Sequence, residues 1–178
     1  MVFKLKEGQR LEKLKLRAED RADITILSAY LQDAVTIMGD ITYQHKGRRF
    51  VMMLNRYVWE NRCPETGDVI LREGQDMEQN INMACCRIRT GLHFDDVLKI
   101  SSQNIAMTAK DKPLELLSIE AYETETETFH VDFIFSGDGI IRLECEIISA
   151  HMQDIGTPWP AKCHPEHDIL DDLQDENS

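Results

Sequence analysis

Arginine residues supply the clearest candidate binding groups in this sequence. Arg49 and Arg56 fall on one predicted strand, Arg87 and Arg89 on a second, and Arg142 on a third. If these strands are neighbours, the arginines line one surface suited to bidentate contact with carboxylate or phosphate. The alternative is that each arginine pairs across strands with the many Asp and Glu side chains. With the tryptophan that ends the first strand, the candidate ligand- or partner-binding residues are Arg49, Arg56, Trp59, Arg87, Arg89 and Arg142.

A metal-binding candidate lies near the C-terminus, in the run Cys163-His164-Pro165-Glu166-His167. Thiolate and imidazole are good zinc ligands, and Cys163, His164 and His167 could converge in a loop. Zinc ligands usually occur as spaced pairs, however, whereas these three are crowded together. The alternative interpretation is a polar exit segment before a tail, so we expect the protein to hold no metal and no cofactor.

His93, followed by Asp95 and Asp96, is a candidate for acid–base chemistry because an imidazole beside carboxylates can move protons. The same residues also make an ordinary strand end and turn. The sequence has no glycine-rich phosphate loop, no G-x-S-x-G, no H-E-x-x-H and no C-x-x-C motif. An enzyme or metalloprotein built on His93 or on the 163–167 run is therefore an alternative and not the leading hypothesis.

The overall charge restricts the classes of partner. The formal net charge is −12, whereas nucleic acids and anionic membranes are bound through basic patches, so neither partner is expected. No apolar run approaches the roughly 20 residues that span a bilayer. Five cysteines without a secretory signal predict reduced thiols and a cytoplasmic location.

The best-defined element that the sequence predicts is a β-hairpin in residues 127–148. Side chains alternate in polarity on both arms, which predicts one buried face and one face toward water. Gly137 and Gly139 flank Asp138 between the arms, and glycine supplies the positive φ angles of tight turns. The core face is expected to carry Phe133, Phe135, Leu143 and Cys145, and the wet face Asp132 and Glu144.

The remaining pattern predicts an α+β fold. A helix is expected at about 20–34, capped by Asp20, and a short helix at about 148–155 from the spacing of Ile148, Met152 and Ile155. About seven antiparallel strands should curl into an open barrel or two-layer roll, and a pleckstrin-homology-like roll is one concrete version.

The composition of the sequence predicts that the chain is divided into three regions. Residues 1–12 read as a basic N-terminal arm, and residues 13–165 as a single globular domain. Residues 166–178 contain six acidic side chains and no Lys or Arg, which predicts an acidic disordered tail.

Several stretches together resemble one known family. They are LSAYLQDA at 27–34, GRRFVMMLNRYVWE at 47–60, GLHFDDVLKISS at 91–102, F-x-G-x-G-x-I-R-L-E at 135–144, and D-x-G-x-x-W followed by PEH within 154–167. The chain resembles an uncharacterised alphaproteobacterial family, a domain of unknown function, over about residues 14–167. The resemblance implies no activity and no catalytic residues.

The leading hypothesis for function is a non-enzymatic cytoplasmic interaction or adaptor domain with a protein partner, which could be a second copy of the chain. A different class of function is a small-anion or ligand-binding barrel that uses the arginine-lined face. The third is the metalloprotein or enzyme that uses Cys163, His164 and His167, or His93.

Overall fold

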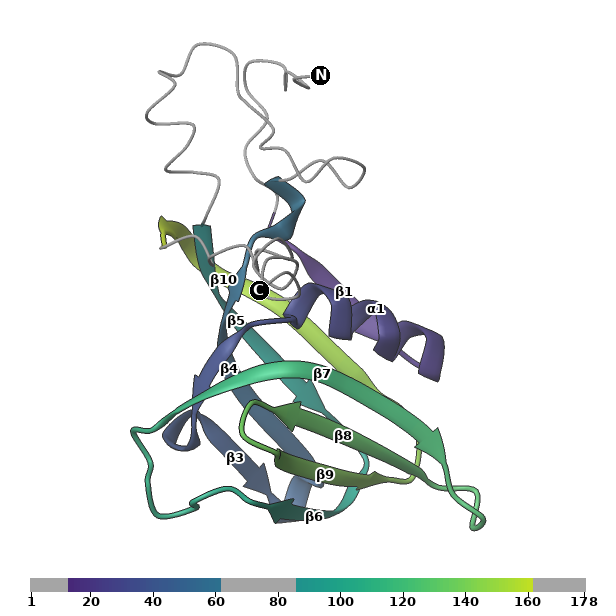
Figure 1. Cartoon of the computed structure of the whole chain (residues 1–178). Coiled ribbons are helices and arrows are strands. Elements are labelled where there is room, and N and C mark those ends of the chain that lie inside the picture. Colours follow the sequence, from purple (N-terminus) through teal and green to yellow (C-terminus); the bar gives the residue numbers. More distant parts are fainter. Residues whose placement is uncertain (1–12, 62–85, 162–178) are drawn as a thin grey trace, which may run out of the picture.

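The computed structural model describes residues 13–61 and 86–161, which form an antiparallel sheet with one α-helix beside it (Figure 1). The α-helix is α1 (Arg21–Leu31), and short 3-10 turns occupy Met38–Asp40, His45–Gly47 and Trp59–Asn61. The strands are β1 (Lys15–Ala18), β2 (Val35–Ile37), β3 (Ile41–Gln44), β4 (Arg49–Tyr57), β5 (Cys86–Phe94), β6 (Val97–Gln103), β7 (Pro113–Glu123), β8 (Phe129–Phe135), β9 (Gly139–Cys145) and β10 (Ala150–Pro160).

The strands follow the order β1-β10-β5-β4-β2-β7-β8-β9-β6, and β3 pairs with β4 beside this path. The sheet bends over on itself, because the Phe133 ring on β8 lies 5.5 Å from Phe50 on β4 and 5.6 Å from Phe94 on β5. Its two end strands, β1 and β6, are not paired with each other, so the sheet is not closed. The predicted α+β fold with a mainly antiparallel sheet is confirmed, and the described residues form ten strands where about seven were expected. The pleckstrin-homology-like roll stays a prediction.

Helix α1 forms where the sequence predicts it. The Asp20 side chain accepts a hydrogen bond from the Asp23 backbone N–H at 2.8 Å, which caps the first turn. Ile24, Leu27 and Leu31 recur on one stripe and are buried. The helix ends at Leu31, three residues before the predicted limit, and Asp33 has a left-handed backbone (φ 59°). No helix in the described part of the chain is long and apolar enough to cross a membrane.

The predicted hairpin is also present, as β8 and β9 joined by a turn with Phe135 opposite Gly139. Gly137 and Asp138 in this turn have φ angles of 75° and 59°. The four side chains assigned to the core, Phe133, Phe135, Leu143 and Cys145, are all buried. Asp132, assigned to the wet face, is only 7% exposed because other polar side chains surround it.

The predicted helix at about 148–155 is wrong, because the chain forms strand β10 there. Ala150, Met152 and Asp154 are buried in alternation, the period of a strand, while Ile155 is 47% exposed. Ile148 and Met152, four residues apart, fit both the helical and the strand period, whereas Ile155 fits only the helical one. Pairing with β1 and β5 on both sides selects the strand. Tertiary contacts therefore determine the secondary structure of this segment.

The larger of two core clusters among the described residues includes buried side chains from α1, from β4 and β5, and from β7, β8, β9 and β10. It extends through both halves of the bent sheet. The predicted basic arm (1–12) and acidic tail (166–178) lie outside the described residues, so both stay predictions.

Candidate functional site

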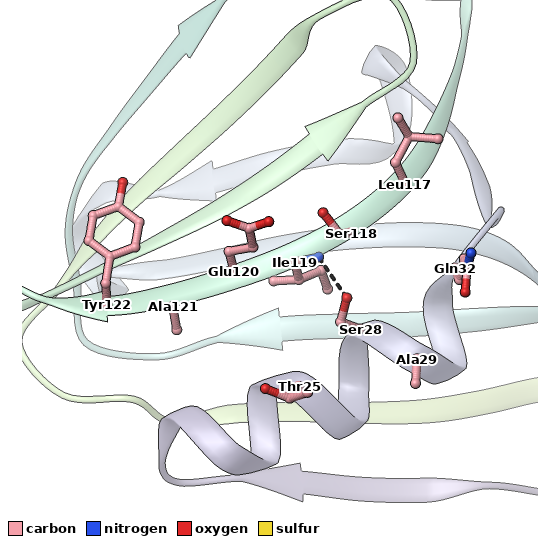
Figure 2. A pocket seen from close by; sticks show the side chains of 10 residues that line it. All are labelled: Thr25, Ser28, Ala29, Gln32, Leu117, Ser118, Ile119, Glu120, Ala121 and Tyr122. Atoms are coloured by element: carbon pink, nitrogen blue, oxygen red, sulfur yellow. Dashed lines mark hydrogen bonds between the residues drawn. The ribbon is translucent and has the colours of Figure 1, made fainter.

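Helix α1 and strand β7 enclose an open groove (Figure 2) of about 740 Å³. Because the helix turns Ile24, Leu27 and Leu31 into the core, another side of it is left to line the groove. Small and polar side chains form both walls. The lining residues are Thr25, Ser28, Ala29 and Gln32 from α1, and Leu117, Ser118, Ile119, Glu120, Ala121 and Tyr122 from β7.

Hydrogen bonds hold the helix along β7. The Ile119 backbone N–H donates to Ser28 Oγ at 2.8 Å, near the middle of the groove (Figure 2). Beyond the end of the helix, Leu116 N donates to the Ala34 carbonyl and Asp33 N donates to the Leu116 carbonyl, both at 2.8 Å. These bonds fix the width of the groove without a strand between its walls.

A polar network fixes Tyr122 at one end of the groove. The Tyr122 hydroxyl donates to Asp132 Oδ2 at 2.7 Å, and Arg142 donates to both Asp132 oxygens at 2.7 Å. Arg142 also contacts the Tyr122 hydroxyl directly. The three residues lie on adjacent strands β7, β8 and β9, so the sheet itself positions them.

The network changes the ionisation of its members. Burial alone would raise the pKa of Asp132, but hydrogen bonds from Arg142 and Tyr122 outweigh burial and lower it below its ordinary value of 3.8. Burial and the hydrogen bond to Asp132 raise the pKa of Tyr122. The pKa of Arg142 is raised, chiefly by its hydrogen bond to Asp132. At neutral pH the network is therefore an ion pair with a neutral phenol.

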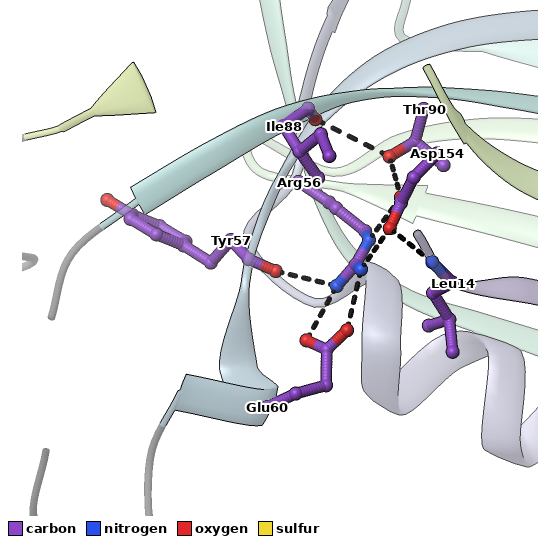
Figure 3. A network of polar contacts seen from close by, with 7 residues as sticks. All are labelled: Leu14, Arg56, Tyr57, Glu60, Ile88, Thr90 and Asp154. Carbon is purple, nitrogen blue, oxygen red and sulfur yellow. Dashed lines mark hydrogen bonds and ion pairs between the residues drawn. The ribbon is translucent and has the colours of Figure 1, made fainter. Parts of the chain in front are cut away.

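Arg56 lies at the centre of a second network, inside the protein (Figure 3). Its Nε and Nη2 donate to the two oxygens of Asp154 at 2.8 and 2.6 Å. Nη1 and Nη2 donate to Glu60 at 2.9 and 2.7 Å, and Nη1 also donates to the Tyr57 carbonyl at 3.0 Å. Asp154 in turn accepts hydrogen bonds from Thr90 Oγ1 and from a backbone N–H of the segment before β1.

This buried network joins β4, β5, β10 and the entry to β1. Burial would raise the pKa of Asp154, but the hydrogen bonds and charge of Arg56 lower it below 3.8. Burial would lower the pKa of Arg56, and its bonds to Asp154 and Glu60 raise it instead. Every guanidinium N–H and both Asp154 oxygens are used within the fold, so Arg56 acts in the structure as an internal clamp.

Arg87 packs on the face of Tyr57, with its guanidinium carbon 3.9 Å from the ring centroid. It donates to the Asn55 carbonyl at 2.7 Å and to the Asp33 carbonyl at 3.2 Å. The Trp59 ring lies 5.3 Å from the Tyr57 ring, and its buried Nε1 has no hydrogen-bond partner in the described part of the chain.

Arg89 points to the same face of β5 as Arg87, as the strand period predicts. Its Nη2 donates to Asp40 at 2.7 Å and its Nη1 donates to the Asn55 side chain at 3.2 Å. Arg49, at the far end of β4, donates to Asp95 at 2.6 Å. The structure therefore brings Arg87, Arg89 and Trp59 together around Asn55 and Tyr57. Arg49 lies at the far end of β4, Arg56 is buried and Arg142 lies on β9, so the six predicted residues form no single arginine-lined face.

His93 lies beside two further candidate metal ligands, Asp95 and His151. Its Nε2 is 3.6 Å from Asp95 Oδ2, and its ring stacks on the His151 ring with centroids 4.9 Å apart. Burial lowers the pKa of His93, Asp95 partly opposes this, and the charges of Arg49 and His151 lower the pKa further. The sequence drew attention to His93 and Asp95, whereas His151 was assigned to a helix.

A smaller hollow of about 300 Å³ lies where the sheet is open, between β3 and β6. Most of its walls are apolar, and Tyr43 spans it by donating to the Val97 carbonyl at 2.7 Å. The lining residues are Met38, Ile41, Tyr43, His45, Phe50, Ile100, Ser101, Ser102, Met107 and Ile141. Nothing in the sequence alone brings these segments together.

The predicted ligands Cys163, His164 and His167 lie outside the described residues. Cys86 and Cys145 are both buried, and burial raises the pKa of the Cys145 thiol to about 12, which makes it unreactive at neutral pH. Sequence reasoning missed Ser28, Tyr122 and Asp154. Asp154 could have been noticed as a carboxylate inside an apolar alternation, but that alternation was assigned to a helix.

Comparison with known proteins identifies a family and no activity. A family model described as "Protein of unknown function (DUF2948)" matches residues 14–167. No curated protein and no solved structure matches the chain.

Proposed function

Because the chain belongs to the DUF2948 family, whose description assigns no activity, we propose a function from the groove itself. The protein is an interaction domain that binds an extended, lysine- or arginine-containing segment of a partner protein along strand β7. The single observation that carries this proposal is a length of β7 edge that faces the groove without a neighbouring strand.

The edge is defined by the pairing of β7. Strand β2 covers only Pro113, Leu114 and Glu115, whereas β8 pairs with β7 from Leu116 to Glu123. Past Leu116, therefore, no strand in the described part of the chain lies on the groove side of β7. Backbone groups on such an edge are a template for an added strand.

Hydrogen-bond direction supports this geometry. The Ile119 N–H points away from β8, because it donates to Ser28 Oγ on the helix. In an antiparallel pair the backbone groups of alternate residues point to the same side, so the N–H and C=O of Ala121 also face the groove. An incoming strand would find the N–H and C=O of Ala121 there, while the Ile119 N–H stays bonded to Ser28.

The walls suit an extended chain. Ala29 and Ser28 on the helix and Ala121 on the strand are small, which leaves room for a peptide backbone. Leu117 is 45% exposed on the groove wall and offers an apolar contact for one side chain of the partner. The fixed ring of Tyr122 offers a second contact at the other end.

Charge defines the chemistry of the partner. Glu120 is the charged residue among those that line the groove, and the whole chain carries a net charge of −12. A basic side chain on the incoming strand can pair with Glu120 across the ladder, whereas an acidic segment would be repelled.

The test is selection of peptides from a random displayed library on the full chain, followed by affinity measurement on variants. Ala29→Trp places a large side chain in the groove from an exposed helix position and should weaken binding of the selected peptides at least tenfold. Ile26→Trp, on the same helix but outside the lining, is the matched control and should bind as the wild type does.

Reversal of the charge at position 120 provides a second test. Glu120→Lys should shift the selected sequences from basic to acidic residues at one position. The proposal is overturned if no peptides are selected, if Ala29→Trp and Ile26→Trp bind them equally, or if the groove variants change only self-association measured by ultracentrifugation.

A further inference from the structure

Two imidazoles and a carboxylate gather on the outer face of the β5–β10 pair. His93 on β5 lies directly opposite His151 on β10 in the strand register. Asp95 follows two residues after His93, at the turn into β6. Phe94 between them is buried in the core, so His93 faces the other way.

The three side chains converge. One ligand atom from each of them lies within 4.8 Å of the other two, and all three side chains are partly exposed. His93 Nε2 and Asp95 Oδ2 are 3.6 Å apart. His151 Nδ1 is buried and has no hydrogen-bond partner in the part of the chain that the structure describes.

We propose that His93, Asp95 and His151 bind a divalent transition-metal ion such as Zn²⁺. Imidazole nitrogen and carboxylate oxygen are the ligands these ions prefer, and two histidines with one carboxylate form a recurrent ligand set. Coordination through the buried His151 nitrogen would supply the partner it lacks. Three protein ligands leave further coordination positions to water or substrate, as in catalytic and not structural metal sites.

The distances require a small closure of the site. Zinc bonds of about 2.0–2.1 Å at tetrahedral angles place ligand atoms roughly 3.3 Å apart. The His93–Asp95 separation of 3.6 Å is already close to this value. The stacked imidazoles must rotate about their side-chain bonds to point at a common ion, and their partial exposure leaves room for that rotation.

Arg49 orients the carboxylate. Its Nε donates to Asp95 Oδ1 at 2.6 Å, whereas Oδ2 is the oxygen that faces His93. One oxygen of Asp95 is therefore held by the protein and the other is directed to the proposed ion. Outer hydrogen bonds of this kind commonly orient metal ligands.

The experiment is calorimetric titration of the tag-free full chain with Zn²⁺, supported by the visible absorption of the Co²⁺ form. We expect one equivalent of Zn²⁺ to bind. His93→Ala and His151→Ala should each weaken binding at least tenfold, since even outer-sphere changes cost 10- to 100-fold. His45→Ala, which removes an exposed histidine that is not part of the cluster, is the matched control and should leave affinity unchanged.

A triple variant, Cys163→Ala with His164→Ala and His167→Ala, separates the proposed site from the C-terminal candidate ligands and should still bind Zn²⁺. Asp95→Asn, which changes only one carboxylate at a turn, tests the site even if a histidine variant does not fold. The proposal is overturned if Zn²⁺ does not bind, if all variants bind it equally, or if binding is lost only in the triple variant.

Discussion

Arg56 and Asp154 show how a charged side chain is accommodated inside this protein. Both are almost fully buried, and every polar atom of the pair has a hydrogen-bond partner. A buried ion pair of this kind contributes little net stability compared with apolar packing, but removal of one partner leaves an uncompensated charge. The importance of the pair is therefore measured by the loss of unfolding free energy when one partner is removed.

Asp154→Ala should lower the free energy of unfolding by about 3–5 kcal/mol, because Arg56 would stay buried without its principal counter-ion. Urea unfolding measures this change. The control is Arg17→Ala, which removes an ion pair with Glu19 whose side chains are 61% and 62% exposed, and which should have little effect. Equal, small losses in the two variants would contradict the clamp role of Arg56.

Acid should destabilise the protein through Asp132 and Asp154. The folded-state pKa of each lies below 3.8, so both stabilise the fold above their unfolded-state pKa and lose this contribution as pH falls through the folded-state pKa. The free energy of unfolding should therefore decrease below about pH 4.

Asp132→Asn should make the dependence of unfolding free energy on pH shallower in this range, because the group that takes up a proton is gone. Asp111→Asn, in an exposed loop, is the control. The same pH dependence in Asp132→Asn as in the wild type would rule out Asp132 as a source of acid sensitivity.

At the scale of elements, helix α1 packs on the sheet through Ile24, Leu27 and Leu31 and adds one side-chain hydrogen bond in the groove, from Ile119 N–H to Ser28. Ser28→Ala should lower the free energy of unfolding by about 1 kcal/mol and speed hydrogen exchange of the Ile119 amide, because that N–H loses its acceptor. NMR measures the exchange rate directly. Thr25→Ala, whose hydroxyl bonds only to its own helix, should leave the Ile119 rate unchanged. Unaltered exchange in Ser28→Ala would show that water replaces the serine.

The local pattern of apolar and polar residues predicted an element correctly where that pattern matches the buried and exposed faces of the element. The β8–β9 hairpin has one core face, so its alternation predicts the buried apolar side chains correctly, but not the burial of Asp132 on the other face. The Asp20 cap and the apolar stripe likewise predict α1. Strand β10 was assigned to a helix because a few apolar residues fit both periods, and only its neighbours β1 and β5 distinguish them.

The candidate site was less accessible to sequence reasoning, because it depends on strand order. Ser28 and Ile119 are separated by 91 residues and carry no recognisable motif. The arginines attracted attention by type, but their partners, such as Asp154 for Arg56 and Asp132 for Arg142, follow from the register of distant strands. Residue type indicated the chemistry, and the topology determined which groups meet.

At the scale of the whole molecule, one apolar cluster includes both halves of the bent sheet. Unfolding should therefore be a single cooperative transition. Circular dichroism reports the sheet and the fluorescence of Trp59 and Trp159 reports the ends of β4 and β10, so the two urea midpoints should coincide. Two separate midpoints would mean that the halves unfold independently.

The pairing of β1 with β10 has a consequence for synthesis on the ribosome. Lys15 leaves the ribosome long before its partner Gln153, and Arg56 is synthesised 98 residues before Asp154. A nascent chain must therefore keep β1 unpaired until β10 has been synthesised. A product that terminates before β10 lacks both the partner strand of β1 and the counter-ion of Arg56. Premature termination therefore yields a protease-sensitive chain instead of a smaller folded domain.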